Sequence, residues 1–139
     1  MNRIKIMFLI CGLPILGYIF LHIYPNDIKA RLAIDRNVEL SSGIGDIDYL
    51  DRLAGELELA FRDFAPDLII YNAGTDILAG DPLGRMNISE QGIIDRDEMV
   101  FRKALSKKVP IVMLLSGGYQ KENAAVIAKS IENILQIMP

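Results

Sequence analysis

The sequence contains one cysteine and one histidine among its 139 residues. The single Cys11 permits no internal disulfide and no cysteine-based metal cluster. The single His22 restricts metal chemistry further, because most catalytic zinc sites use at least one histidine ligand. A basic cluster is also lacking, since the net charge is −3 and the isoelectric point is about 5.1. Direct nucleic-acid binding through a cationic face is therefore not expected.

Apolar residues are what the sequence has in abundance. They make up 51% of the chain, and the mean hydropathy is +0.27. The length suits one domain with a real core. This apolar composition predicts either a membrane-like segment or a surface that packs against further protein.

The apolar N-terminal segment, residues 1–21, has two interpretations. Residues 6–23 contain no Asp, Glu, Lys or Arg and follow a basic start, as in a signal sequence or an anchor. Membrane contact and a membrane location would then follow. Pro14 and two glycines interrupt the run, however. The alternative is a buried strand of an α/β core, and the sequence favours neither interpretation.

Residues 67–138 follow the order strand, loop, helix, strand, loop, helix, which favours an α/β fold with parallel strands. The predicted helices are 46–64, 89–107 and 122–137, and the predicted strands are 37–40, 68–71 and 111–115. Asp46 and Ser89 are the expected N-caps of the first two helices. The last helix is expected to turn six apolar residues inward: Ala124, Ile127, Ala128, Ile131, Ile134 and Leu135.

Two loops carry the candidate site. A long loop, 72–88, follows one strand and contains Asp76, while Ser116-Gly-Gly-Tyr119 follows the next. Parallel strands end at one edge of a sheet, so Asp76 and Tyr119 are expected to approach one pocket. Asp76 suits a metal ligand, a general base or a ribose partner, but also an ordinary turn residue. Tyr119 suits either an oxyanion donor or a buried aromatic residue.

These motifs resemble a known family. Tyr71-Asn-Ala-Gly-Thr-Asp76-Ile-Leu-Ala-Gly-Asp81-Pro-Leu-Gly84 and Ser116-Gly-Gly-Tyr119 are similar to the C-terminal part of the catalytic domain of zinc-dependent histone deacetylases, with the class IV branch nearest. The resemblance implies that residues 22–139 form a partial deacetylase domain. It also implies the C-terminal portion of an arginase/deacetylase-like three-layer fold with a mostly parallel sheet.

The resemblance also implies roles for particular residues. Asp76 matches a zinc ligand, and Tyr119 matches the tyrosine that polarises the acyl-lysine carbonyl. Leu83, Gly117 and Gly118 match positions that bind the acyl-lysine substrate. The implied cofactor is zinc, the implied partner is an acyl-lysine protein such as a histone, and the implied location is the nucleus or cytoplasm.

The family's histidine motifs have no counterpart here. The family holds zinc with an Asp-x-His pair and a second Asp, and moves protons with paired histidines, whereas this chain has only His22 within His-Ile-Tyr-Pro. A turn or packing role is the expected one for His22. One carboxylate does not hold catalytic zinc, so the chain is expected to be inactive alone and to retain no zinc.

Three interpretations of such a chain stay open. It is a truncated deacetylase, a non-catalytic binding or regulatory module that is membrane-tethered through residues 6–23, or half of a site completed by another chain. A small parallel sheet with an unpaired edge also predicts marginal stability and self-association through that edge.

Overall fold

The computed structural model describes residues 4–10, 35–36 and 38–138. The strands and helices within this part follow one another in the order β1 Ile6–Ile10, α2 Asp46–Asp63, β2 Leu68–Asn72, α3 Glu90–Lys107, β3 Ile111–Leu114 and α4 Asn123–Ile137. Strands alternate with helices from β2 onward, which confirms the predicted α/β organisation.

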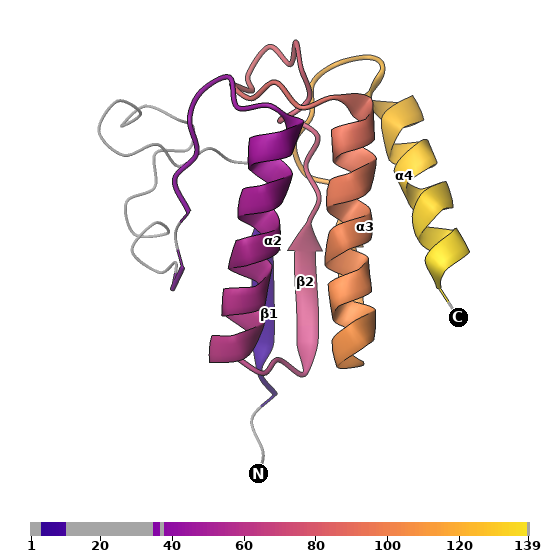
Figure 1. The fold of residues 1–139 in the computed structure, drawn as a ribbon. Helices are drawn as coiled ribbons and strands as arrows, with labels where there is room; N and C mark the ends of the chain where they lie inside the picture. Colours follow the sequence, from indigo (N-terminus) through magenta and orange to yellow (C-terminus); the bar gives the residue numbers. More distant parts are fainter. Residues whose placement is uncertain (1–3, 11–34, 37, 139) are drawn as a thin grey trace.

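The three strands form one parallel sheet in the order β1-β2-β3. Phe8 lies beside Ile70, which lies beside Val112, and this row fixes the register. Helices α2 and α3 lie side by side over one face of the sheet, and α4 packs against α3 (Figure 1). The loops that follow β2 and β3 gather beyond the carboxyl ends of the strands (Figure 1).

The core lies between the sheet and helices α2 and α3. Along β2, Ile69 and Tyr71 are fully buried toward the helices, and their neighbours are only half-buried. This alternation follows from the two-residue period of a strand. The ring of Tyr71 meets that of Phe101 edge-on, with 6.5 Å between the ring centroids.

The two predicted helix caps have different outcomes. Ser89 caps α3 as predicted, because its hydroxyl accepts a hydrogen bond from the Gly92 amide at 3.0 Å. The prediction for Asp46 is wrong, since the cap of α2 is Gly45 and Asp46 is its first helical residue. The Asp46 carboxylate instead accepts hydrogen bonds from the Ser89 amide at 2.8 Å and hydroxyl at 2.5 Å. It therefore joins the starts of two helices.

The structure describes only residues 4–10 of the N-terminal segment. Residues 6–10 form β1 and pair with β2, while 11–23, including His22, lie outside the described residues. No helix within the described ranges is long and apolar enough to cross a bilayer. The strand predicted at 37–40 is wrong for 38–40, which are irregular, and residue 37 lies outside the description.

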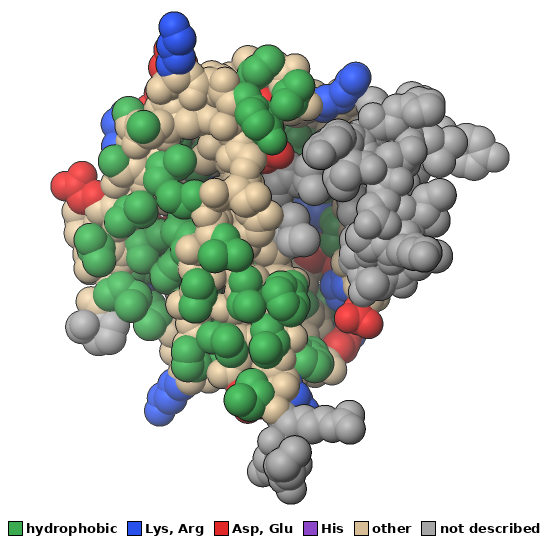
Figure 2. All heavy atoms as spheres, turned by 180° about the vertical axis from the view of Figure 1, so that it is seen from behind, with side chains coloured by type: hydrophobic (Ala, Val, Ile, Leu, Met, Phe, Trp, Pro, Cys, Tyr) green, Lys and Arg blue, Asp and Glu red, His purple; other side chains and the backbone are tan. Residues whose placement is uncertain are grey.

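The inward face of α4 differs from the prediction. Its buried residues are Asn123, Val126, Ser130 and Ile134, whereas Ile131 and Leu135 remain exposed. Only part of the helix's apolar surface meets α3. Hydrophobic side chains are also widely exposed on the side of the molecule opposite to the view in Figure 1 (Figure 2).

Candidate functional site

The loops after β2 and β3 meet at the carboxyl ends of the strands, as the parallel order predicts. The Ala73 amide donates to the Leu114 carbonyl at 2.8 Å, and the Thr75 amide donates to the Gly117 carbonyl at 3.0 Å. These bonds continue the pairing of the two strands into their loops. Asp76 and the Gly117–Tyr119 segment are therefore neighbours in space.

The Asp76 carboxyl lies against the backbone of the second loop. A Cβ atom added at Gly117 would lie 2.9 Å from its Oδ2, so only glycine permits this approach. Its Oδ1 is buried and has no hydrogen-bond partner among the described residues. Burial raises the pKa of the Asp76 carboxyl to about 6. The nearby Asp81 carboxylate raises this pKa further, whereas a hydrogen bond from the backbone of Asp76 itself lowers it.

Glycine is required at both positions before Tyr119. Gly117 and Gly118 have φ angles of +92° and +113°, a region that other residues rarely adopt. A Cβ atom at Gly118 would also lie 2.0 Å from the Thr75 hydroxyl oxygen. The backbone of these two glycines therefore lies directly on the first loop.

The Asp81 carboxylate connects the two loops. Its Oδ1 accepts from the amides of Leu83 at 2.9 Å and Gly84 at 2.8 Å, and its Oδ2 accepts from the Tyr119 amide at 2.8 Å. The side chains it positions are open to solvent, with Leu83 68% and Tyr119 59% exposed. The alternative interpretation of Tyr119 as a buried aromatic residue is wrong.

A buried ion pair supports the backbone that leads to Asp76. Arg96 of α3 is fully buried and donates to the carbonyls of Gly74 at 2.6 Å and Ala73 at 3.1 Å. Its Nε donates to Asp97 at 2.8 Å, and the Ser130 hydroxyl donates to the other oxygen of Asp97 at 2.6 Å. The sequence pattern does not predict this buried pair, because adjacent charges on a helix normally indicate its solvent-facing side.

The described residues contain no complete metal site. No group of three or more His, Cys, Asp or Glu side chains that could hold a metal occurs within 4–10, 35–36 and 38–138. Asp76 has the chemistry of a ligand there, since its buried Oδ1 has no hydrogen-bond partner among these residues. A complete zinc site would need further ligands from outside this described part.

Comparisons with known proteins identify the family. Residues 21–135 match the family model of the histone deacetylase domain. Histone deacetylase 2 from Arabidopsis thaliana is 58% identical over 112 residues, which cover 81% of this chain and 29% of that protein. Histone deacetylase 8 from Xenopus tropicalis is 34% identical over 89 residues, covering 64% of this chain and 23% of that one.

Solved structures agree on the fold. The HD domain of HDA15 superposes with a TM-score of 0.65 at 26% identity, over 84% of this chain and 36% of that domain. An acetylpolyamine aminohydrolase from Burkholderia pseudomallei has the same fold, with a TM-score of 0.61 at 24% identity over 73% of this chain and 28% of that one. The matched part thus spans about a quarter to a third of its relatives' length. It belongs to the histone deacetylase family and contains part of that family's catalytic domain.

Proposed function

We propose that this chain supplies one zinc-binding carboxylate and the oxyanion-stabilising phenol of an acyl-lysine amide hydrolase, and that it does not hydrolyse the amide alone. Asp76 is the proposed zinc ligand and Tyr119 the proposed catalytic residue. The observation that carries the proposal is the buried Oδ1 of Asp76, which lies beside Gly117 and has no hydrogen-bond partner in the part of the chain that the structure describes. Structures rarely leave a buried carboxylate oxygen unsatisfied unless it has a ligand or a catalytic role.

Asp76, Tyr119 and the residues beside them have different proposed roles. Asp76 binds the cation from a partly dry site, where attraction between opposite charges is stronger than in water. Tyr119 donates its phenol proton in a hydrogen bond to the oxygen on which negative charge develops. Gly117 and Gly118 let the backbone before Tyr119 pack directly against Asp76 and Thr75, and the exposed Leu83 gives a slender acyl-lysine chain an apolar surface beside it. Zinc, when bound, supplies the Lewis acidity that activates water and polarises the amide.

Activity requires groups that this chain does not carry in the described part. Proton transfer in such hydrolysis needs a base near neutral pH, and the chain's only histidine is His22. The proposed substrate is an acyl-lysine protein such as a histone, met in the nucleus or cytoplasm. We also assign the chain to the class IV branch, supported by the Tyr71–Gly84 and Ser116–Tyr119 motifs.

A complementation experiment tests the proposal. The chain alone is dialysed and analysed for zinc and for acyl-lysine hydrolysis, and both are expected to be absent. It is then mixed with the upstream two thirds of the Arabidopsis relative, which is expected to restore zinc and hydrolysis together.

Variants of the mixture separate the two roles. Asp76→Asn is expected to lose zinc and activity, whereas Tyr119→Phe should keep zinc and lose about 100- to 1,000-fold in rate. Asp51→Asn, on the exposed side of α2, is the control and should change neither. Stoichiometric zinc with hydrolysis by the unmixed chain would refute the proposal.

A further inference from the structure

The Asp81 carboxylate lies between the two loops that carry the proposed site. Asp81 is only 8% exposed, and both of its carboxylate oxygens accept hydrogen bonds from backbone amides. Oδ1 accepts from Leu83 at 2.9 Å and Gly84 at 2.8 Å, and Oδ2 accepts from Tyr119 at 2.8 Å. Hydrogen bonds of this length to a charged acceptor are about twice as strong as those between neutral groups. One side chain therefore holds three backbone positions.

Tyr119 is held in place through its backbone. Its side chain is 59% exposed, and Gly117 and Gly118 before it have no side chains that could pack against the protein. The place of the phenol therefore depends on the direction of the main chain at position 119. The hydrogen bond from the Tyr119 amide to Asp81 fixes that direction.

The same carboxylate also fixes the first loop of the site. Through Oδ1 it holds Gly84, which packs on the backbone of Asp76: a Cβ atom at Gly84 would lie 1.7 Å from the Asp76 carbonyl oxygen. The amide of Leu83, the proposed substrate contact, donates to the same oxygen. Asp81 thus connects the proposed zinc ligand, the proposed substrate surface and the phenol.

Gln120 joins the same two loops independently of Asp81. Its side-chain amide donates to the carbonyl of Ala79 at 2.9 Å and lies 3.4 Å from that of Leu78. The Thr75 amide also donates to the Gly117 carbonyl at 3.0 Å. The loops therefore remain connected when the bond from Tyr119 to Asp81 is removed, and the effect of its removal is local.

We infer that Asp81 is a positioning residue, which sets the place of the Tyr119 phenol relative to Asp76 and Leu83. The inference rests on the proposed function of Asp76 and Tyr119. Both oxygens of Asp81 bind amides, so it acts on the reaction through Tyr119 and not by contact with the substrate. A phenol displaced by about 1 Å from the developing oxyanion costs about 100-fold in rate. Asp81 is therefore expected to control the rate of hydrolysis and to leave the zinc content unchanged.

Asp81→Asn tests the inference in the mixture with the upstream part of the Arabidopsis relative. Asparagine has the same shape but only one acceptor oxygen, which is expected to stay with the two amides of Leu83 and Gly84. Its NH₂ group then faces the Tyr119 amide, so a donor meets a donor. With zinc and substrate saturating, kcat should fall about 10- to 100-fold, while zinc stays stoichiometric and KM changes less than about threefold. The lost charge itself would act in the opposite direction, because a nearby carboxylate disfavours a developing oxyanion.

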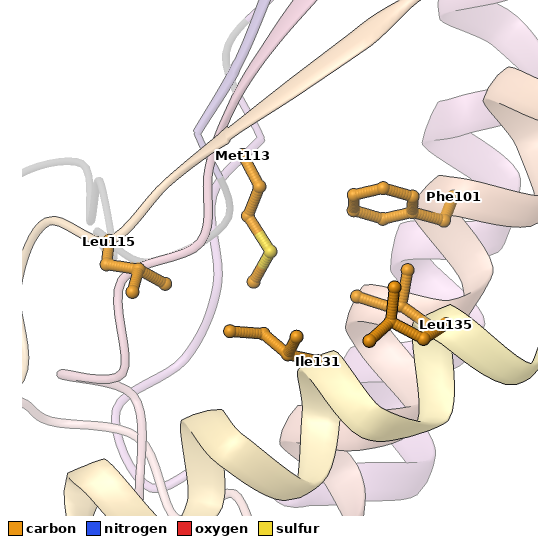
Figure 3. A pocket seen from close by; sticks show the side chains of 6 residues that line it. Phe101, Met113, Leu115, Ile131 and Leu135 are labelled. Atoms are coloured by element: carbon orange, nitrogen blue, oxygen red, sulfur yellow. The ribbon is translucent and has the colours of Figure 1, made fainter. Parts of the chain in front are cut away.

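Two control variants separate positioning from general loosening. Asp51→Asn makes the same chemical change at an exposed carboxyl and should leave kcat within about twofold. Leu115→Ala weakens the packing of the segment that leads to Tyr119 without touching Asp81. The Leu115 side chain lines an apolar pocket of about 250 Å³, which Figure 3 shows together with Met113 and Ile131. This variant should lose stability and keep its kcat, and a rate loss equal to that of Asp81→Asn would overturn the inference.

A second variant removes the hydrogen bond and leaves Asp81 in place. Incorporating p-hydroxyphenyllactic acid at position 119 replaces the Tyr119 amide by an ester, so the N–H is lost while the phenol and the carboxylate remain. The same fall in kcat with unchanged zinc is expected. Circular dichroism shows whether Asp81→Asn is folded, and the ester variant decides the matter if it is not. An unchanged kcat in the ester variant, or loss of zinc together with rate, would overturn the inference.

Amide hydrogen exchange of the unmixed chain gives a measurement that needs no activity. In Asp81→Asn the Tyr119 amide should exchange about 10-fold faster or more, while the amides of Leu83 and Gly84 stay protected. Equal protection of the Tyr119 amide in both chains would overturn the inference. If the unmodified mixture does not hydrolyse the substrate, the proposed function fails, and the exchange rates show separately whether Asp81 holds Tyr119.

Discussion

Replacing Asp76 by asparagine is expected to stabilise the isolated chain at neutral pH. The carboxyl is largely buried, and its pKa is raised from 3.8 to about 6 mainly by that burial. At pH 7.5 the folded chain must therefore keep a charge in a site that disfavours it. Asparagine has nearly the same shape and carries no charge, so the Asp76→Asn variant avoids this penalty.

The size of the effect follows from the two pKa values. A rise from 3.8 to about 6 corresponds to about 3 kcal/mol, and solvent screening of the accessible part reduces this to about 1–2 kcal/mol. Because the folded pKa lies above the unfolded one, protonation favours the fold. This contribution is complete below about pH 4 and is lost as the pH rises through 6. The advantage of Asp76→Asn should therefore be 1–2 kcal/mol at pH 7.5 and near zero at pH 4.

Urea unfolding at fixed protein concentration measures this difference, with chelator present so that no metal contributes. The comparison of variant with parent at each pH cancels the carboxyls whose pKa values shift in the opposite direction, such as Glu98. Asp51→Asn, at an exposed carboxyl, should be neutral within about 0.5 kcal/mol at both pH values. An advantage of Asp76→Asn that is equal at pH 4 and pH 7.5, or a loss of stability at pH 7.5, would refute the electrostatic reasoning.

Three further substitutions, with Gly55→Ala as a control, test the packing around the loops by urea unfolding. Gly74→Ala should lose about 1–3 kcal/mol, because its Cβ would lie 2.2 Å from a backbone oxygen, whereas Gly55→Ala, with open space in α2, should gain about 0.5–1 kcal/mol. Arg96→Met should lose about 3–5 kcal/mol, because it leaves the buried Asp97 carboxylate without its cation; a loss below 1 kcal/mol would contradict the support role. Ser89→Ala should lower the free energy of unfolding by about 1–2 kcal/mol, because it removes the cap of α3. An unchanged urea midpoint would contradict a stabilising role of this cap.

Local patterns predict the elements well and their partners poorly. The helix periods and the strands after 67 depend on residues near one another in the sequence, and the structure contains them within a few residues. The parallel order was enough to bring the loops of Asp76 and Tyr119 together. The buried face of α3 includes Arg96 and Asp97, whose partners Gly74 and Ser130 lie 22 and 33 residues away in the sequence. Because the partners lie outside the helix, the spacing of residues within α3 does not predict that this pair is buried.

The error at Asp46 has the same origin. A carboxylate before a helical run normally indicates a cap, but here its partner is Ser89, 43 residues along the chain. Likewise, Ile131 and Leu135 have a buried pattern in a helix whose neighbours leave them exposed. The spacing of apolar residues shows which surface of a helix is apolar. It does not show which other residues pack against that surface.

The contact between Asp46 and Ser89 explains a glycine that otherwise weakens α3. A Cβ atom at Gly92 would lie 2.4 Å from the Asp46 carboxylate, so the first turn of α3 can hold that carboxylate only if position 92 lacks a side chain. Glycine inside a helix lowers its stability by about 1 kcal/mol relative to alanine. One carboxylate then serves the positive ends of two helix dipoles. Positions 46, 89 and 92 are therefore expected to vary together, although Ile88, whose Cγ2 would lie 2.7 Å from the same Cβ atom, is a second reason for the glycine.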